Sequence, residues 1–183
     1  MALTNSLTQW GAVSKTLHWL IVVLIIVQYT LAEAVEDMSG YGKLVTLARH
    51  KSIGLTILGL AILRLLWRWM NPTPELPAGM KSWERWAAKL SHFLLYALLF
   101  AMPLAGWALS SASNFPVRWF GLVTLPDFVP ADKELQHFFH DLHEGLFKVL
   151  VTLAVVHVAA ALRHHFVNKD NVLKRMLPFV RVP

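Results

Sequence analysis

Nine histidines and no cysteine limit the metal chemistry that this chain of 183 residues can support. Without cysteine there is no disulfide, no thiolate-ligated iron–sulfur cluster and no covalently attached c-type haem. Any metal site must therefore depend on histidine. Seven histidines lie in or at the ends of long apolar segments, where ionisable residues are costly and usually mark function. They are His18, His50, His92, His143, His157, His164 and His165.

His143 and His157 lie fourteen residues apart in one apolar segment. In an α-helix this separation puts them within about 40° of the same face and about 21 Å apart along the axis. Antiparallel neighbouring helices place His50 at the depth of His143, and His18 at the depth of His157. Two His–His pairs at different depths favour two six-coordinate b-type haems inside a four-helix bundle.

Other interpretations of the histidines remain open at this point. His92 has the same depth as His18, and spacing does not choose between them. A lone intramembrane histidine can simply hydrogen-bond a facing helix. A closed zinc or copper site needs clustered ligands, whereas these are split between two depths. His137, His140 and His143 form an i, i+3, i+6 series, which suits either a surface metal site or a solvated helix start.

The elements that carry these histidines are predicted to span a membrane. The chain is 56% hydrophobic, only 15% charged and has a mean hydropathy of +0.49, against about 25% charged residues in a typical soluble domain. Its apolar residues form four blocks, each near the length of about 20 residues that a spanning helix needs. We expect an all-α integral membrane domain over residues 1–183, with the first block retained as a span. The predicted spans are 15–34, 48–69, 87–109 and 138–166.

Charge in the short loops predicts the orientation. With the N-terminus inside, the inner side holds eleven of the seventeen basic residues, Arg181 included, and the outer side holds eight of the eleven acidic ones. Both termini are then cytoplasmic. The net charge of +6 is explained by membrane topology, so we expect no nucleic-acid partner.

Several short motifs, taken in order, resemble those of the bacterial cytochrome b561 family, which are small di-haem, quinone-linked proteins of the inner membrane. The resemblance covers nearly the whole chain. The matching stretches are Leu17-His18-Trp19-Leu20, His50-Lys51-Ser52-Ile53-Gly54, Arg64 through Arg68 with Pro72-Thr73-Pro74, Gly121-Leu122, Leu142-His143-Glu144, His157, Ala161 through Phe166, Lys169-Asp170 and Leu173 through Met176.

The resemblance implies four haem ligands and an activity. His18, His50, His143 and His157 match the family's ligands of two b haems, which settles His18 over His92. One branch of the family acts as a superoxide oxidase that moves electrons from periplasmic superoxide to ubiquinone. The resemblance therefore implies a multi-pass inner-membrane oxidoreductase that works with the quinone pool.

Basic residues near His50 suit the attraction of superoxide. Arg49 and Lys51 flank His50, and Arg118 lies in the other outer loop. Cations around an exposed haem edge draw in a small anion. The alternative is that Arg49 and Lys51 pair with haem propionates.

Residues at the inner ends of the spans are candidates for the quinone site. Reduction of a quinone takes up two protons, and histidine suits proton transfer near neutral pH. His164 is proposed as the proton donor or as a hydrogen-bond partner of the quinone. Arg163, Arg68, Ser14 and Lys15 are predicted at the same depth, although such residues also anchor helices or bind lipid headgroups.

Two other functional classes remain. One is a cytochrome b subunit that relays electrons between quinol or quinone and a dehydrogenase or a periplasmic redox protein. The other is a haem-free transporter or a structural membrane protein.

Overall fold

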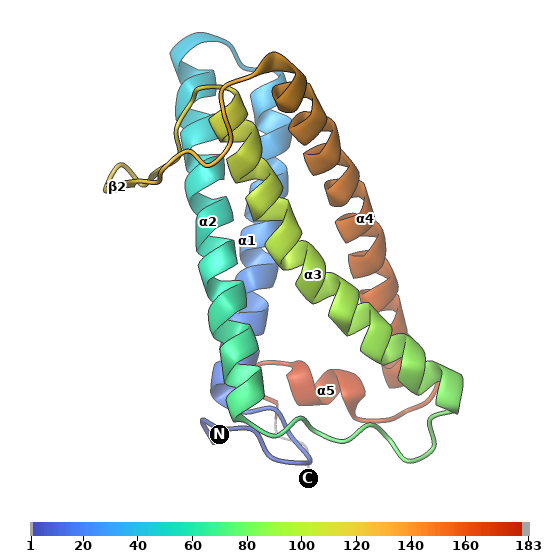
Figure 1. Cartoon of the computed structure of the whole chain (residues 1–183). Helices are drawn as coiled ribbons and strands as arrows, with labels where there is room; N and C mark the ends of the chain where they lie inside the picture. Colours follow the sequence, from blue (N-terminus) through green and yellow to red (C-terminus); the bar gives the residue numbers. More distant parts are fainter. Residues whose placement is uncertain (1, 181–183) are drawn as a thin grey trace. The chain divides into compact units, whose positions relative to one another are not determined.

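The computed structural model describes residues 2–180, most of which are helical (Figure 1). The four long helices are each long and apolar enough to cross a membrane, which confirms the predicted all-α membrane fold. They are α1 (Ala12–Glu36), α2 (Gly40–Met70), α3 (Ser82–Ala112) and α4 (Lys133–Phe166). A two-stranded hairpin, β1 (Arg118–Trp119) and β2 (Val123–Thr124), and the short α5 (Val172–Met176) complete the elements. Arg181, used in the topology prediction, lies outside the described residues.

Local sequence sets where the long helices begin and end. The segment that contains Pro72 and Pro74 separates α2 from α3, because proline disfavours helix at the preceding residue. After α3 the chain turns at Asn114, whose φ of 51° lies in the left-handed region that asparagine tolerates. The Asp132 carboxylate accepts a hydrogen bond of 2.9 Å from the Leu135 amide and so caps the start of α4.

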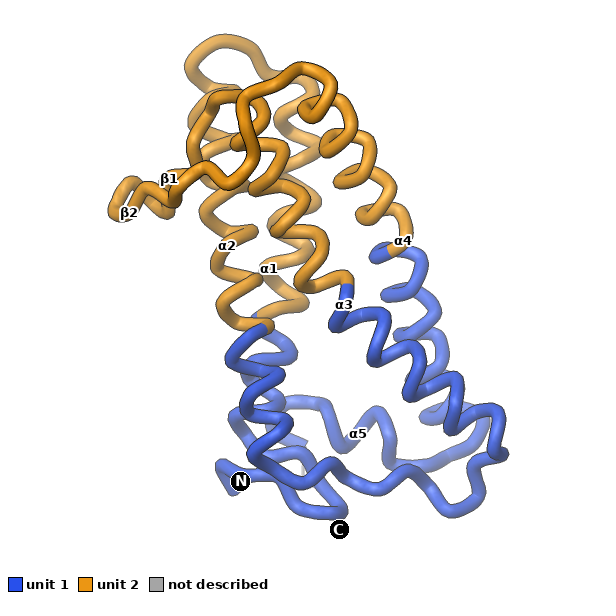
Figure 2. The backbone as a smooth tube through the Cα atoms, in the orientation of Figure 1, with its two compact units in different colours: residues 1–20, 62–97, 150–183 blue, residues 21–61, 98–149 orange. Residues whose placement is uncertain are grey.

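The chain divides into two compact units, which Figure 2 colours separately. Unit 1 contains residues 1–20, 62–97 and 150–183, and unit 2 contains residues 21–61 and 98–149. Each of the four long helices contributes one part to each unit. Every unit therefore has four helical segments among which a ligand could be held.

In unit 1 the N-terminal segment is fixed by the buried side chain of Asn5. The Asn5 Oδ1 atom accepts hydrogen bonds from the Ser14 hydroxyl at 2.7 Å and the Gly11 amide at 3.0 Å. The Asn5 amide nitrogen donates to the Pro72 carbonyl at 3.1 Å. These bonds join the N-terminal segment to α1 and to the α2–α3 connection.

In unit 2 the segment between α3 and α4, residues 113–132, folds back onto α2, and we call it the strap. The Lys51 ammonium donates to the Phe115 carbonyl at 2.9 Å. The Ser52 hydroxyl accepts from the Phe120 amide at 2.9 Å. The Trp119 indole donates to the Thr56 hydroxyl at 3.1 Å. Three side chains of α2, spaced along one side of the helix, thus hold the strap.

Burial is distributed as a membrane helix requires. The buried residues of α3 in unit 2 are mainly small, such as Ala105, Ala108 and Ser111, and small residues allow close helix contact in lipid. Large apolar side chains such as Ile26, Val155 and Val158 are exposed. Their exposure is explained by contact with lipid rather than with water.

Candidate functional site

Unit 1 brings His18 of α1 and His157 of α4 together. Their ring centroids lie 6.5 Å apart with an interplanar angle of 69°. The two histidines come from opposite ends of the sequence, and the fold makes them neighbours. The predicted partnership at this depth is therefore present as a spatial pair.

Unit 2 contains a second pair of the same kind. The rings of His50 on α2 and His143 on α4 have centroids 6.3 Å apart and an interplanar angle of 71°. Both pairs thus have nearly the same separation, although they belong to different units and use different helices.

This separation fits one metal ion between each pair of rings. An imidazole nitrogen lies about 1.1 Å from its ring centroid and binds a metal at about 2.0 Å, so two rings on opposite sides of one ion have centroids about 6 Å apart. Six-coordinate b-type haem iron needs two such ligands. The residues present in each unit therefore fit a haem held by two histidines.

Hydrogen bonding in unit 2 leaves ring nitrogens free for a ligand. The Nδ1 atom of His143 donates to the Met102 carbonyl at 3.1 Å, which fixes the ring and leaves Nε2 without a proton, as in metal-bound histidines. The Nδ1 atom of His50 is buried and has no hydrogen-bond partner among the described residues.

Glycine provides the space that the His143 ring occupies. A Cβ atom added at Gly106 of α3 would lie 3.0 Å from Cε1 and 3.3 Å from Nδ1 of His143. At Gly54 of α2 an added Cβ would lie 3.2 Å from the side-chain nitrogen of Gln28. The sequence analysis did not identify Gly106, because nothing in the local sequence indicates which side chain crosses it.

His92 is the competing residue that spacing alone left open. Its ring centroid on α3 lies 5.5 Å from that of His157, nearer than the 6.5 Å between His18 and His157. Both separations lie about 0.5 Å from the roughly 6 Å expected for two ligands of one iron. The ring separations therefore do not choose between His18 and His92 as the partner of His157.

The predicted superoxide-attracting residues have different environments within unit 2. Arg49 on α2 and Arg118 on β1 are exposed. Lys51 donates to the Phe115 carbonyl and lies 3.5 Å from the centroid of the Phe115 ring. Lys51 thus holds the strap, while Arg49 and Arg118 are exposed to solvent.

The predicted quinone residues in unit 1 are divided between a pocket and structural contacts. Ser14 and Arg68 line one pocket. Lys15 donates to the Val180 carbonyl at 3.1 Å, and Arg163 pairs with Glu84 at 3.0 Å. His164 is buried and its Nδ1 atom lies 2.5 Å from a carboxylate oxygen of Asp170.

The pocket also has lining residues that the sequence analysis did not assign to a quinone site. They are Trp10, Arg64, His92, Tyr96 and Met176. Arg64 could have been identified from the sequence as a candidate, because it is an ionisable residue within an apolar helix, four residues before Arg68.

Among residues 2–180 no group of three or more histidine, aspartate or glutamate side chains is arranged to hold a metal ion. The series His137, His140 and His143 therefore does not form the surface metal site that was left open. His140 instead lies 3.3 Å from the neighbouring Asp141 carboxylate, with both side chains exposed.

Comparisons with known proteins agree with this arrangement. Residues 9–179 match the family described as prokaryotic cytochrome b561. Cytochrome b561 homolog 2 of Escherichia coli K12 is 34% identical over 97% of this chain and 95% of its own length. Cytochrome b561 homolog 1 of the same strain is 30% identical over 90% of this chain and 96% of its own length. A protein of Yersinia pestis named probable superoxide oxidase CybB is 30% identical, covering 88% of this chain and 92% of that protein. The chain therefore belongs to the prokaryotic cytochrome b561 family, as a b-haem-binding electron-transfer protein of the bacterial inner membrane.

Proposed function

We propose that the protein is a superoxide:ubiquinone oxidoreductase that uses two b haems. His50 and His143 hold one haem, and His18 and His157 hold the other. The observation that carries the proposal is the presence of two histidine pairs with centroid separations of 6.3 and 6.5 Å. Each separation fits one iron, and the two pairs lie in separate units. The relative named probable superoxide oxidase supports superoxide as the donor.

The haem irons supply the one-electron chemistry, and the chain supplies binding, orientation and charge. Two superoxide anions each lose one electron and leave as dioxygen. One quinone takes up the two electrons together with two protons and leaves as quinol. No bond to carbon forms or breaks, so the residues act through position and charge.

On the side of unit 2, Arg49 and Arg118 are exposed cations that attract superoxide to the His50–His143 haem. Lys51 contributes to the same field while holding the strap through the Phe115 carbonyl. The haem propionates remain an alternative partner of Arg49 and Lys51, and both roles are compatible.

In unit 1, Ser14 and Arg68 line the pocket in which a quinone would bind. His164 is the proposed proton donor at this end of unit 1, although it does not line the pocket; its Nδ1 atom lies 2.5 Å from the Asp170 carboxylate and 3.2 Å from the Asn168 side-chain nitrogen. Lys15 holds the C-terminal segment through the Val180 carbonyl, and Arg163 of α4 holds α3 through Glu84.

The test is the visible spectrum of the purified, oxidised holoprotein during a pulse of superoxide with excess ubiquinone present. We expect reduced b-haem bands to appear rapidly and then to decay as quinol accumulates. Superoxide dismutase added before the pulse is the control and should abolish the reduction. Haem bands that do not respond to superoxide would contradict the proposal.

The second candidate is an electron-relay subunit between quinol or quinone and another redox protein. It is favoured by the position of Lys51, because its ammonium group is held by the Phe115 carbonyl and ring and is not free to contact an incoming anion. Haem bands that respond to quinol but ignore superoxide would support it. Absence of haem after expression with adequate haem supply would contradict both candidates and favour a haem-free membrane protein.

A further inference from the structure

The hairpin formed by β1 and β2 in unit 2 presents exposed apolar side chains in the middle of the strap. Val117, at the base of the hairpin, is 2% exposed, whereas Trp119, Phe120, Leu122 and Val123 are 37%, 54%, 76% and 56% exposed. The rings of Trp119 and Phe120 form an edge-to-face pair with centroids 5.5 Å apart. A group of neighbouring exposed apolar side chains marks a surface that contacts another molecule or lipid.

Hydrogen bonds to α2 fix the depth of the hairpin along that helix. The Ser52 hydroxyl accepts from the Phe120 amide at 2.9 Å, and the Trp119 indole donates to the Thr56 hydroxyl at 3.1 Å. Ser52 and Thr56 lie four and eight residues inside the predicted span 48–69, which is about 6 and 12 Å at a rise of 1.5 Å per residue. The hairpin is therefore attached at the level of the outer leaflet and not above the membrane.

The direction of the hairpin carries its tip away from α2 at this depth. Figure 1 shows the hairpin extending sideways from the helix, and Figure 2 shows the same path within unit 2. Most of the Leu122 side chain, at the tip, touches no described residue. An element that leaves a spanning helix sideways below the outer end of the span meets lipid before it meets water.

The turn at the tip contains a residue that does not suit a hairpin in water. The Leu122 amide donates to the Trp119 carbonyl at 2.9 Å and closes a turn around Phe120 and Gly121. Their φ angles are 47° and 75°, as in a type I′ turn, for which asparagine and glycine are preferred. A bulky side chain in the left-handed region is an outlier and costs free energy. Transfer of the exposed Phe120 side chain from water into lipid offsets that cost.

The charge of the hairpin also suits the surface of a bilayer. Arg118 is the single charged residue between positions 114 and 126. It is exposed and forms no ion pair with a described residue. The stem of an arginine can lie along apolar surface while its guanidinium reaches the phosphate of a lipid headgroup. Tryptophan, here Trp119, is enriched at the same interface.

We propose that the β1–β2 hairpin is a membrane-interface anchor, which inserts sideways into the outer leaflet. Its exposed apolar side chains lie among the lipid chains, and Arg118 lies at the phosphate headgroups. Lipid is favoured over a water-soluble protein partner, because such a partner would have to reach below the outer end of α2. The anchor also holds α2 beside a proposed haem ligand, since Ser52, which binds the hairpin, is two residues after His50. The proposal goes beyond electron transfer and does not depend on it.

The absence of cysteine permits a test by spin labelling at single introduced cysteines. Leu122→Cys and, as a second position, Val123→Cys are labelled with a nitroxide in the haem-loaded protein. The protein is placed in nanodiscs of phosphatidylethanolamine and phosphatidylglycerol, which leave both membrane faces accessible. Power-saturation electron paramagnetic resonance then measures collisions of the label with molecular oxygen, which concentrates in lipid, and with a polar nickel chelate, which stays in water.

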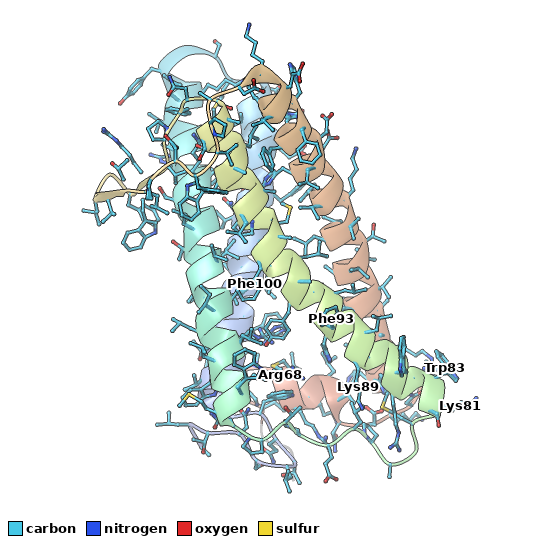
Figure 3. The ribbon with its side chains drawn as sticks, viewed as in Figure 1. Arg68, Lys81, Trp83, Lys89, Phe93 and Phe100 are labelled. Carbon is cyan, nitrogen blue, oxygen red and sulfur yellow. The ribbon has the colours of Figure 1, made fainter. Side chains whose placement is uncertain are left out.

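Three further single-cysteine variants calibrate the measurement. Ile26→Cys labels an exposed apolar position of α1 in unit 2 and is the lipid reference. Lys133→Cys labels the exposed first residue of α4 and is the water reference of the same unit. Lys81→Cys labels an exposed residue that directly precedes α3 and is the water reference of unit 1; Figure 3 labels Lys81. Haem per protein and the thermal unfolding midpoint are measured for every labelled variant.

We expect the ratio of oxygen to nickel collisions at Leu122 and Val123 to match that at Ile26. It should exceed the ratio at both lysine positions by about fivefold or more, because lipid excludes the polar chelate. A ratio equal to that at the lysine positions would overturn the proposal, since the hairpin would then lie in water. Protection from both reagents would also overturn it, since protein, such as a second copy of this chain, would then cover the hairpin. Neither reagent reports on superoxide or quinone, so failure of the proposed function would leave this result unchanged.

Discussion

The imidazole ring of His143 lies directly against Gly106 of α3. A Cβ atom at Gly106 would lie 3.0 Å from Cε1 of His143, tighter than ordinary contact. The same ring donates from Nδ1 to the carbonyl of Met102, one turn earlier on α3, at 3.1 Å. Gly106, which has no side chain, thus fixes the position of the His143 ring, and the Met102 carbonyl fixes its tautomer.

Substitution of Gly106 should therefore weaken haem binding in unit 2. In Gly106→Ala the added methyl group pushes the His143 ring off its carbonyl and away from the iron position. We expect lower occupancy or an altered low-spin signal of one of the two haems, measured by haem per protein and by electron paramagnetic resonance. The matched control is Gly59→Ala on α2, where an added Cβ meets nothing within 4 Å. Equal behaviour of the two variants would contradict this role for Gly106.

Removal of single histidines should separate the two sites. His50→Ala and His143→Ala should lose one haem, and His18→Ala and His157→Ala the other, so that each retains about half of the haem. The measurement is the pyridine haemochrome assay per mole of protein, with a redox titration to identify which haem remains.

His92→Ala distinguishes the assigned pair from its competitor. We expect this variant to keep both haems, because His18, in the stretch Leu17-His18-Trp19-Leu20, is the residue that matches the family's ligand motif. His137→Ala, a change in the helical turn before His140, serves as a control that should also keep both. Loss of haem in His92→Ala with retention in His18→Ala would reverse the assignment.

The exposed arginines of unit 2 should act through long-range attraction. The double variant Arg49→Gln with Arg118→Gln should slow haem reduction by superoxide by roughly threefold to tenfold at low ionic strength. High salt should reduce the difference, because screening shortens the range of the field. Stopped-flow spectra at several ionic strengths measure the rate of haem reduction by superoxide in the variant and the wild type. A rate deficit that persists unchanged at high salt would instead indicate a local structural change.

The pair formed by His164 and Asp170 should stabilise the C-terminal segment. One oxygen of Asp170 lies 2.5 Å from Nδ1 of His164, and the other accepts from the Val172 amide at 3.0 Å. Asp170→Ala removes both interactions, which we expect to cost about 1.5–3 kcal/mol. The midpoint of thermal unfolding in detergent should fall by about 5 °C, with faster proteolysis after α4.

Lys174→Ala is the control for that experiment, since Lys174 is exposed on α5. It should leave the unfolding midpoint and the proteolysis rate unchanged. If Asp170→Ala also behaves as the wild type, the pair does not hold the segment.

The sequence by itself determined the four membrane helices, because long apolar runs bounded by polar and proline-containing segments leave few alternatives. It also predicted which histidines could ligate haem, because helix periodicity and depth follow from the local sequence, although these left His18 and His92 equivalent. The separation of fourteen residues from His143 to His157 is sufficient to place both on nearly one face.

Only the tertiary structure decided what surrounds those histidines. Periodicity could not separate His18 from His92, because both lie at one depth, and the structure places both rings near that of His157. It could not show that Lys15, Arg163 and His164 make structural contacts, since their partners Val180, Glu84 and Asp170 lie on other segments or beyond the end of α4. The pocket with Arg64 and Arg68 is likewise assembled from four separate stretches of the chain. The physical reason is common to all of them: a helix fixes the direction of each side chain, whereas the packing of other segments fixes what that side chain meets.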